Sequence, residues 1–214
     1  MSAVIFGAGT YGEVYLHYLR DAGVDVVGFL DDDSAKHGSR VLDVPVLGGS
    51  DYLAGALDAG VAQVFCPVGN NAVRLRVNRQ ARAMGLVTPN FVHRSAMVDS
   101  QLAADAGIYV FPGSVIMPFV DIRPDVMISM GVKVAHHTTL EDGVFLSTGV
   151  SVGASICLRE RAYVGMSATL VTGKCRSVGA GAMIGAGAVV VSDVPDDAVF
   201  AGVPAKMIKS GKLL

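Results

Sequence analysis

The sequence predicts two domains of different architecture: an α/β domain with a parallel sheet over residues 1–88, and a parallel β-helix of six-residue repeats over residues 89–214. Two observations lead to this prediction. Strand-like and helix-like segments alternate in the first part, which is typical of parallel strands joined by helices. Beyond residue 90 the helical spacing of apolar residues disappears, and an aliphatic residue recurs at every sixth position instead.

In the first domain, short apolar runs are followed by segments with helical spacing. Strands are expected at residues 3–6, 24–30, 44–47 and 63–67. Helices are expected at residues 13–22, 51–59 and 72–84. Gly23 and Gly85 follow the first and the third of these helices and favour helix ends there.

In the second domain, isoleucine, leucine or valine occupies every sixth position from 110 to 170. The positions are Val110, Ile116, Ile122, Ile128, Val134, Leu140, Leu146, Val152, Leu158, Val164 and Leu170. The residue two positions earlier is small or β-branched throughout, from Ile108 to Ala168. Two inward residues per hexad fit a narrow triangular coil of three hexads, so residues 18 apart are expected to stack.

The six-residue phase also indicates where the β-helix begins and where it is interrupted. Val92, Val98 and Ala104 keep the phase before Val110. After Leu170 the phase slips by two residues and resumes at Val178, which predicts a small corner loop around residues 174–177. A sandwich of short strands is the alternative fold, but it requires turn signals every 8–12 residues and no fixed six-residue phase.

A glycine-rich loop follows the first expected strand. Gly7, Gly9 and Gly12 form a GxGxxG pattern, in which glycine permits a tight turn and the close approach of a phosphate. Asp31 and Asp32 end the next strand, where a ribose hydroxyl is bound in dinucleotide-binding folds. The domain is therefore Rossmann-like, although it is too short for a full dinucleotide fold. A nucleotide site, a structural turn and a retained cofactor all remain open at this point.

Composition and charge restrict the classes of function. The net charge of −2 gives no electrostatic basis for binding nucleic acid or an anionic membrane. No uninterrupted run of about 18 apolar residues predicts a membrane span, and the first residues lack the basic region of a signal peptide. The three cysteines have no metal-binding or disulfide spacing. We therefore expect a cytoplasmic protein without a disulfide framework.

Two adjacent histidines, His136 and His137, fall at an expected corner of the β-helix, between the inward Val134 and Thr138. Periodicity does not say which of them points into a groove. A histidine at such a corner is suited to act as a general base near neutral pH. Zinc requires three placed ligands, and the remaining histidines, His17, His37 and His93, lie at or before the entry to the β-helix. No metal site is predicted.

The hexads resemble those of the hexapeptide-repeat acyltransferases, and the whole chain resembles the sugar acetyltransferases of bacterial surface-glycan synthesis. These include the sialic acid O-acetyltransferase and the N-acetyltransferases of nucleotide-linked 4-amino sugars. The matching segments are residues 4–12, 29–32 and 69–71, the hexads, and the tail at residues 202–206. The resemblance implies a left-handed β-helix, acetyl-CoA as cosubstrate, and a homotrimer with active sites between subunits.

The resemblance also implies roles for single residues. His136 corresponds to the catalytic base, His137 to its usually acidic partner, and the backbone N–H of Ala154 to the oxyanion donor. A nucleotide-linked 4-amino-4,6-dideoxy sugar would be bound by Gly7, Gly9, Gly12, Asp31, Asp32, Gly69 and Asn70. The CoA groove would be lined by Gly165, Met166, Ala186, Gly202, Pro204 and Lys206, of which Lys206 is suited to meet a phosphate.

Two positions depart from the family pattern. His137 replaces a carboxylate, so either His137 accepts a hydrogen bond as a neutral imidazole, or Glu141 or Asp142 supplies the charge. Glu13 stands where the family often has a lysine after the third glycine, and a carboxylate near a pyrophosphate is unfavourable. Two alternatives to the nucleotide-sugar enzyme therefore remain: an O-acetyltransferase acting on a free sugar such as a sialic acid, and a non-catalytic scaffold that binds CoA or a nucleotide.

Overall fold

The computed structural model describes residues 2–211, which fold into two compact units. The first unit ends at Pro89 and the second begins at Asn90. The sequence predicted the division after residue 88. Each unit has its own apolar core and is described here by itself.

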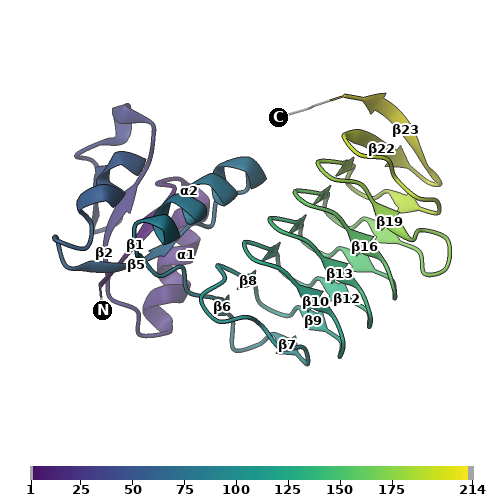
Figure 1. The fold of residues 1–214 in the computed structure, drawn as a ribbon, viewed down its shortest axis with the longest axis horizontal. Coiled ribbons are helices and arrows are strands. Elements are labelled where there is room, and N and C mark those ends of the chain that lie inside the picture. Colours follow the sequence, from purple (N-terminus) through teal and green to yellow (C-terminus); the bar gives the residue numbers. More distant parts are fainter. Residues whose placement is uncertain (1, 212–214) are drawn as a thin grey trace. The chain divides into compact units, whose positions relative to one another are not determined.

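The first unit is a five-stranded sheet with the strand order β3-β4-β2-β1-β5 (Figure 1). Its strands are β1 (Ser2–Phe6), β2 (Val26–Leu30), β3 (Arg40–Val41), β4 (Val44–Gly48) and β5 (Val61–Phe65). All neighbouring pairs are parallel except β3 with β4. Helix α1 (Thr10–Asp21) connects β1 to β2, and helix α2 (Asn71–Ala83) follows β5. The predicted Rossmann-like order of strands and helices is confirmed.

Four elements of this unit differ from the prediction. Helix α1 begins at Thr10, three residues earlier than expected, because the glycine loop itself supplies its N-terminus at Gly9. The segment expected as a helix at residues 51–59 is a short 3₁₀ helix, η2 (Ser50–Gly55), continued by single turns. Gly55 lies in the middle of residues 51–59, and glycine is a poor helix former. The two-residue strand β3 was missed, and so was the 3₁₀ helix η1 (Ser34–Lys36).

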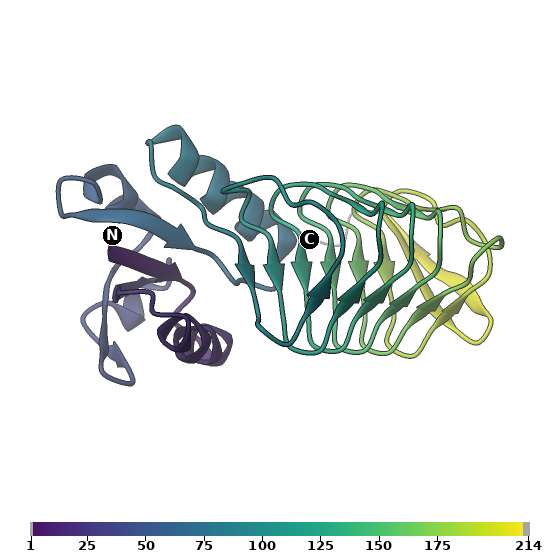
Figure 2. The ribbon, with the colours of Figure 1, turned by 90° about the horizontal axis from the view of Figure 1, so that it is seen from below.

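The second unit is a parallel β-helix whose coils carry strands of two residues (Figure 2). Three stacked sheets have the orders β10-β13-β16-β19, β21-β18-β15-β12-β9-β7 and β23-β22-β20-β17-β14-β11-β8-β6. The strands are β6 (Phe91–Val92), β7 (Met97–Val98), β8 (Tyr109–Val110), β9 (Val115–Ile116), β10 (Asp121–Ile122), β11 (Met127–Ile128), β12 (Lys133–Val134), β13 (Thr139–Leu140), β14 (Phe145–Leu146), β15 (Ser151–Val152), β16 (Cys157–Leu158), β17 (Tyr163–Val164), β18 (Thr169–Leu170), β19 (Ser177–Val178), β20 (Met183–Ile184) and β21 (Val189–Val190).

Registers such as Val134 with Val152 confirm the stacking of residues 18 apart. The chain leaves the last coil through β22 (Ala198–Gly202), which pairs with β20, and turns back as β23 (Ala205–Ser210) in an antiparallel hairpin. Handedness follows the left-handed β-helix acetyltransferases that this unit matches.

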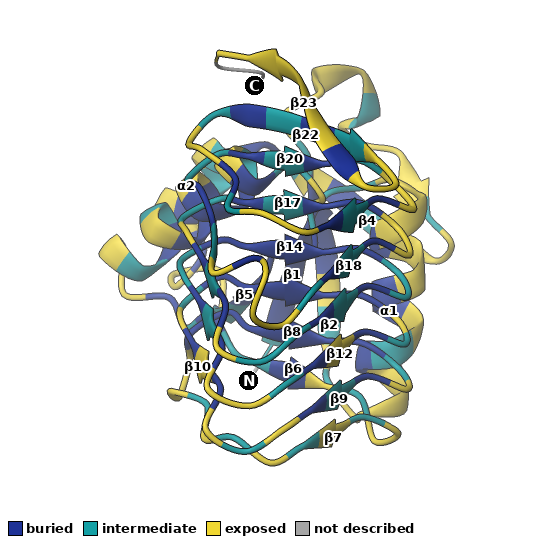
Figure 3. Cartoon of the chain, turned by 90° about the vertical axis from the view of Figure 1, so that its right-hand side faces the viewer, coloured by how far each residue is buried: buried dark blue, intermediate teal, exposed yellow. Residues whose placement is uncertain are grey.

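The interior of the β-helix is filled by the residues of the six-residue phase. Every aliphatic from Val110 to Leu170 is buried, and so is every residue two positions earlier, including the polar Ser114 and Thr138. In Figure 3 the stacked strands are mostly buried, whereas β23 is largely exposed. Val92 keeps the phase and pairs with Val110, but it is 41% exposed because it belongs to the first coil.

The corners of the coils use one residue in the left-handed region at every sixth position. From Gly107 to Gly173 all such positions have φ between +57° and +72°, and six of these twelve residues are glycine. The six non-glycine residues are Phe119, Asp125, His137, Ser155, Arg161 and Ser167. Half of these corners therefore hold a side chain in a conformation that favours glycine.

These corners form three edges along the β-helix. The histidine edge comprises residues 135–138, 153–156 and 171–176, between the sheet of β12 and the sheet of β13. The methionine edge comprises residues 129–132, 147–150, 165–168 and 185–188, between the sheet of β14 and the sheet of β12. The third edge carries residues 141–144, 159–162 and 179–182. The predicted corner loop lies on the histidine edge, as turns at residues 172–174.

Candidate active site

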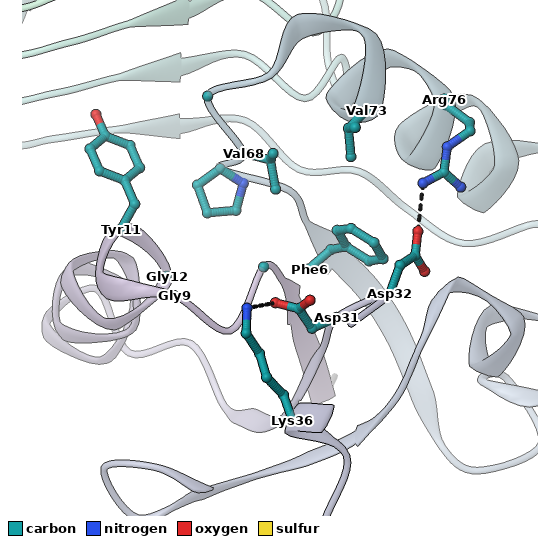
Figure 4. A pocket seen from close by; sticks show the side chains of 13 residues that line it. Phe6, Gly9, Tyr11, Gly12, Asp31, Asp32, Lys36, Val68, Val73 and Arg76 are labelled. Carbon is teal, nitrogen blue, oxygen red and sulfur yellow. Dashed lines mark hydrogen bonds and ion pairs between the residues drawn. The ribbon is translucent and has the colours of Figure 1, made fainter. Parts of the chain in front are cut away.

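A pocket in the first unit lies at the carboxyl ends of β1, β2 and β5 (Figure 4). Strand β1 stands between β2 and β5, so the chain leaves β1 on one side and later returns to the other. Open parallel sheets bind ligands at such a switch point, because the loops after the two strands separate there. The pocket is lined by Phe6, Gly7, Gly9, Tyr11, Gly12, Asp31, Asp32, Lys36, Pro67, Val68, Gly69, Val73 and Arg76.

The glycine loop of the pocket allows no added side chain at its third glycine. A Cβ at Gly12 would collide with the Gly7 carbonyl oxygen and would lie 3.1 Å from the Phe29 ring. Gly7 has a φ of +109°, a conformation that L side chains rarely adopt. The Ala8 N–H donates to Asp31 Oδ2 at 2.9 Å, so the second strand holds the loop in place. Gly12 therefore lets the loop fold tightly against the start of α1.

Two ion pairs place cations in the pocket. Lys36 Nζ lies 2.7 Å from Asp31 Oδ2, and an Arg76 guanidinium nitrogen lies 2.7 Å from Asp32 Oδ2 (Figure 4). Partial burial acts to raise the pKa of Asp31, but hydrogen bonds from Lys36 and from two backbone N–H groups outweigh it and lower the pKa. Burial also acts to raise the pKa of Asp32, but hydrogen bonds from Ser50 and Arg76 outweigh it, so the pKa of Asp32 is lowered too. Both carboxylates are ionised at neutral pH.

Six of the seven residues predicted to bind the substrate line this pocket: Gly7, Gly9, Gly12, Asp31, Asp32 and Gly69. Asn70, the seventh, is not among the lining residues, and its Oδ1 accepts hydrogen bonds from Ala72 N and Val73 N and caps helix α2. Glu13 is exposed on the first turn of α1 and does not line the pocket. Its carboxylate therefore lies outside the place where the sequence suggested a conflict with phosphate.

Sequence reasoning missed Lys36 and Arg76. Lys36 ends the 3₁₀ helix η1, and Arg76 lies on α2, 44 residues after its partner Asp32. No motif joins these residues, but one signal was present. Asp31 and Asp32 are adjacent carboxylates at a strand end, and such a pair favours nearby cations.

The His136 and His137 imidazoles meet at the histidine edge. Nδ1 of His136 lies 2.9 Å from Nδ1 of His137, and the two rings are nearly perpendicular, at 88°. His137 has a φ of +59° and its ring lies 5.1 Å from that of Phe119, one coil earlier. Both histidines are exposed. Within this chain, then, the hydrogen-bond partner of His136 is the other imidazole.

The two acidic alternatives, Glu141 and Asp142, lie on the third edge. Glu141 Oε2 accepts a hydrogen bond from Glu160 N at 2.9 Å. The Asp142 carbonyl accepts one from Arg161 N. Neither is hydrogen-bonded to His136 in the part of the chain that the structure describes.

Ala154 occupies the histidine edge one coil after His136. The Ser155 N–H donates to the His136 carbonyl at 3.1 Å, which fixes the stacking of the two corners. The Ala154 N–H donates to Thr172 Oγ1 at 2.9 Å. The backbone donor that the family resemblance assigned to an oxyanion is thus already bonded to a threonine hydroxyl.

The residues predicted to line a CoA groove lie along the methionine edge and the hairpin that follows it. Met166 is 56% exposed, and its carbonyl accepts a hydrogen bond from Gly187 N. A Cβ at Gly165 would lie 2.7 Å from Ala186 N, so glycine allows the two coils to stack. Gly202, Pro204 and Lys206 belong to the β22–β23 hairpin, in which all three are exposed.

The predicted base and the predicted CoA residues therefore stand on two different edges of the β-helix. His136, Ala154 and Thr172 follow one another at intervals of 18 residues on the histidine edge. Met166 and Ala186 follow one another on the methionine edge. A single chain does not bring the two sets of residues together.

Among residues 2–211, no three His, Cys, Asp or Glu side chains are grouped so as to hold a metal ion. No helix in the same range has the length and hydropathy to cross a bilayer.

Comparisons with known proteins agree with these features. Residues 2–81 match the family model described as the PglD N-terminal domain. The chain is 30% identical to a histidine-to-asparagine variant of perosamine N-acetyltransferase from Caulobacter crescentus, whose crystal structure holds CoA and GDP-perosamine. That alignment covers 98% of this chain and 97% of the other, with a TM-score of 0.88.

A second solved structure is the acetyltransferase domain of PglB from Neisseria gonorrhoeae in complex with acetyl coenzyme A. It is 27% identical, with a TM-score of 0.61 and coverage of 97% of this chain and 98% of the other. Among curated relatives, the serine acetyltransferase of Buchnera aphidicola is 33% identical over 106 residues, which are 42% of this chain and 38% of that protein. The match to this relative thus spans well under half of its length.

Proposed function

Because this chain belongs to the PglD-type family of sugar acetyltransferases with hexapeptide repeats, we propose that it transfers the acetyl group of acetyl-CoA to the amine of a nucleotide-linked 4-amino-4,6-dideoxy sugar. The observation that carries this proposal is the pocket of the first unit, whose glycine loop, paired carboxylates and two cations suit a sugar nucleotide. The end-to-end relative from Caulobacter crescentus holds GDP-perosamine together with CoA.

The pocket supplies the charges that a nucleotide diphosphate needs. The N-terminus of α1 presents backbone N–H groups after Gly9, and helix N-termini favour anions. Lys36 and Arg76 provide positive charge inside the pocket. Glu13 is the feature that favoured a free sugar, and its exposed position outside the pocket removes that argument.

His136 acts as the general base in this proposal. The amine nitrogen attacks the thioester carbonyl carbon, its proton passes to His136, and the C–S bond then breaks to release CoA. The contact between the two Nδ1 atoms requires one of them to donate and the other to accept. When His136 carries the Nδ1 proton, its Nε2 is left as the base and His137 is the acceptor. His137 thus fixes the tautomer of His136 without bringing a charge.

The complete site requires two copies of the chain. The histidine edge and the methionine edge of one β-helix are separate, so the base of one subunit meets the CoA groove of its neighbour. In a closed ring of three subunits, the histidine edge of each subunit faces the methionine edge of the next subunit, and no edge is left without a partner edge. We therefore include a homotrimer with active sites between subunits in the proposal.

Binding and turnover of defined compounds test the proposal. GDP-, UDP- and dTDP-linked 4-amino sugars, and free sialic acid, are each mixed with acetyl-CoA, and release of the CoA thiol is measured. We expect turnover with at least one sugar nucleotide and none with the free sugar. Turnover with the free sugar alone would establish the O-acetyltransferase instead, and the absence of any thermal stabilisation by CoA would leave only a scaffold.

A matched pair of variants locates the sugar nucleotide. Lys36→Ala removes a cation from the pocket, whereas Arg20→Ala removes an exposed ion pair with Asp43 elsewhere in the same unit. The first variant should weaken stabilisation by the preferred sugar nucleotide, and the second should leave it unchanged. Equal behaviour of the two variants would contradict a nucleotide site in this pocket.

A further inference from the structure

A chain of hydrogen bonds crosses three coils of the histidine edge and ends at the Thr172 hydroxyl. Thr138 Oγ1, which is buried, donates to the Gly153 carbonyl at 2.9 Å. The N–H of the same peptide group, on Ala154, donates to Thr172 Oγ1 at 2.9 Å. Both polar atoms of the Gly153–Ala154 peptide are therefore bonded to threonine hydroxyls, one from the coil before and one from the coil after.

The Thr172 hydroxyl accepts in this chain, and its own proton points elsewhere. Among the hydrogen bonds of residues 2–211, none uses this hydroxyl as the donor. Thr172 is exposed at the edge that carries His136. Hydrogen bonds arranged in series polarise one another, so an O–H that accepts from a peptide N–H becomes a stronger donor.

Close packing at Gly153 keeps the threonine in this place. A Cβ at Gly153 would lie 2.6 Å from Thr172 N and would collide with Thr172 Oγ1. Glycine at this position thus allows the hydroxyl to approach the Ala154 N–H. The bonds that fix the hydroxyl come from the coil itself and require no ligand.

We infer that the Thr172 hydroxyl is the direct hydrogen-bond donor to the thioester oxygen, with the Ala154 N–H bonded behind it. This inference rests on the proposed acetyl transfer. As the amine nitrogen bonds to the carbonyl carbon, the π electrons of the C=O bond move to the oxygen, which accepts from Thr172. When the C=O bond re-forms, the C–S electrons leave with the thiolate of CoA, and His136 carries the proton taken from the amine.

The spacing of the coils is compatible with this assignment. His136 and Thr172 lie two coils apart, which is about 10 Å at the usual strand separation. A path from a base to an amine, from the amine to the carbonyl carbon, and from the oxygen to its donor has three steps of about 3 Å each. Thr172 reaches back toward Ala154, so its oxygen ends within this span.

Three substitutions at one position separate the possible roles of Thr172. Thr172→Ser keeps the hydroxyl, Thr172→Ala removes it and uncovers the Ala154 N–H, and Thr172→Val removes it while a methyl group covers that N–H. We expect kcat of the serine variant within about threefold of the wild type. We expect the valine variant to lose about 10²-fold and the alanine variant to fall between the two. The KM for acetyl-CoA should change little, because the bond strengthens in the transition state.

Other rank orders overturn the inference. An alanine variant as fast as the wild type would make the Ala154 N–H the direct donor, and a valine variant as fast as the wild type would give the hydroxyl no role. A serine variant as slow as the valine variant would point to the threonine methyl group. Thr169→Val, on strand β18 of the same coil, is the control for a general Thr→Val effect on folding, and thermal unfolding of each variant is compared with it.

A spectroscopic measurement separates this inference from the proposed sugar substrate. The carbonyl stretch of ¹³C-labelled acetyl-CoA is recorded bound to the wild type and to Thr172→Val, with no sugar present. We expect a shift to lower frequency in the wild type that is lost in the variant. An equal stretch in both proteins overturns the inference even where transfer occurs, whereas failure of every sugar to turn over, with the shift present, counts only against the sugar.

Discussion

The two units bring functional residues together in different ways. In the first unit, Asp32 and Arg76 are 44 residues apart and meet because strand β2 ends, and helix α2 begins, at the same edge of the parallel sheet. In the second unit, His136, Ala154 and Thr172 align because the chain returns to the same edge every 18 residues. An α/β pocket therefore depends on how several elements pack, whereas a β-helix edge depends on a constant period. We therefore expect substitutions in the two units to change different measured quantities.

The largest effect is expected at the histidine edge. His136→Asn removes the proposed base, and general-base catalysis contributes about 10²–10⁴-fold. We expect kcat to fall by about this factor while stabilisation by sugar nucleotide is kept, because the pocket lies in the other unit. Thiol release and thermal shift are measured on the same preparation. A fall below twofold would remove His136 from the chemistry.

The interior of the β-helix should be nearly as sensitive, but in stability rather than in chemistry. Leu146 is fully buried in the stacked core, and Leu→Ala changes in such positions cost about 2–5 kcal/mol. Urea unfolding of Leu146→Ala measures this loss. Lys133→Ala, at an outward and exposed position of β12, is the control and should change the free energy of unfolding by less than about 0.5 kcal/mol. Equal losses would mean that the phase of the hexads does not set the core.

A smaller effect is expected in the pocket of the first unit. Lys36→Ala removes one cation, and we expect the KM for the preferred sugar nucleotide to rise about tenfold, equal to about 1.4 kcal/mol. The KM for acetyl-CoA should stay the same, since the proposed CoA residues lie in the other unit. Steady-state kinetics with each substrate varied in turn measure both constants. A parallel rise in both would argue against the separation of the two sites.

The smallest effect concerns acid. The pKa values of Asp31 and Asp32 are lowered in the folded protein. A lowered pKa adds stability above the ordinary value of about 3.9, and this stability is lost as the pH falls through the lowered value. Thermal unfolding should therefore depend little on these two groups from pH 7 to about pH 5, and Asp32→Asn should reduce the loss at lower pH. An Asp32-dependent loss already between pH 7 and pH 6 would contradict the lowered pKa.

Much of the second unit was predicted from the sequence because inward residues in a β-helix repeat at a fixed interval. The aliphatics from Val110 to Leu170 are all buried, and the slip after Leu170 does produce a loop. The first unit was predicted less completely. The alternation of strands and helices was expected, but residues 51–59 form a 3₁₀ helix and turns, and Oδ1 of Asn70 caps helix α2. Local propensity does not specify which contacts a short segment or a polar side chain makes.

By itself, the sequence determined which residues face the interior of the β-helix, because that choice depends only on the alternation of side chains along a coil of constant length. It also determined the glycine loop after β1, since Gly7 and Gly12 meet backbone limits that other residues do not satisfy. Only the tertiary structure decided the partners of the other polar groups: Lys36 with Asp31, Arg76 with Asp32, and Thr172 with Ala154. These side chains take their orientation from atoms on other elements, and a linear pattern carries no record of those atoms.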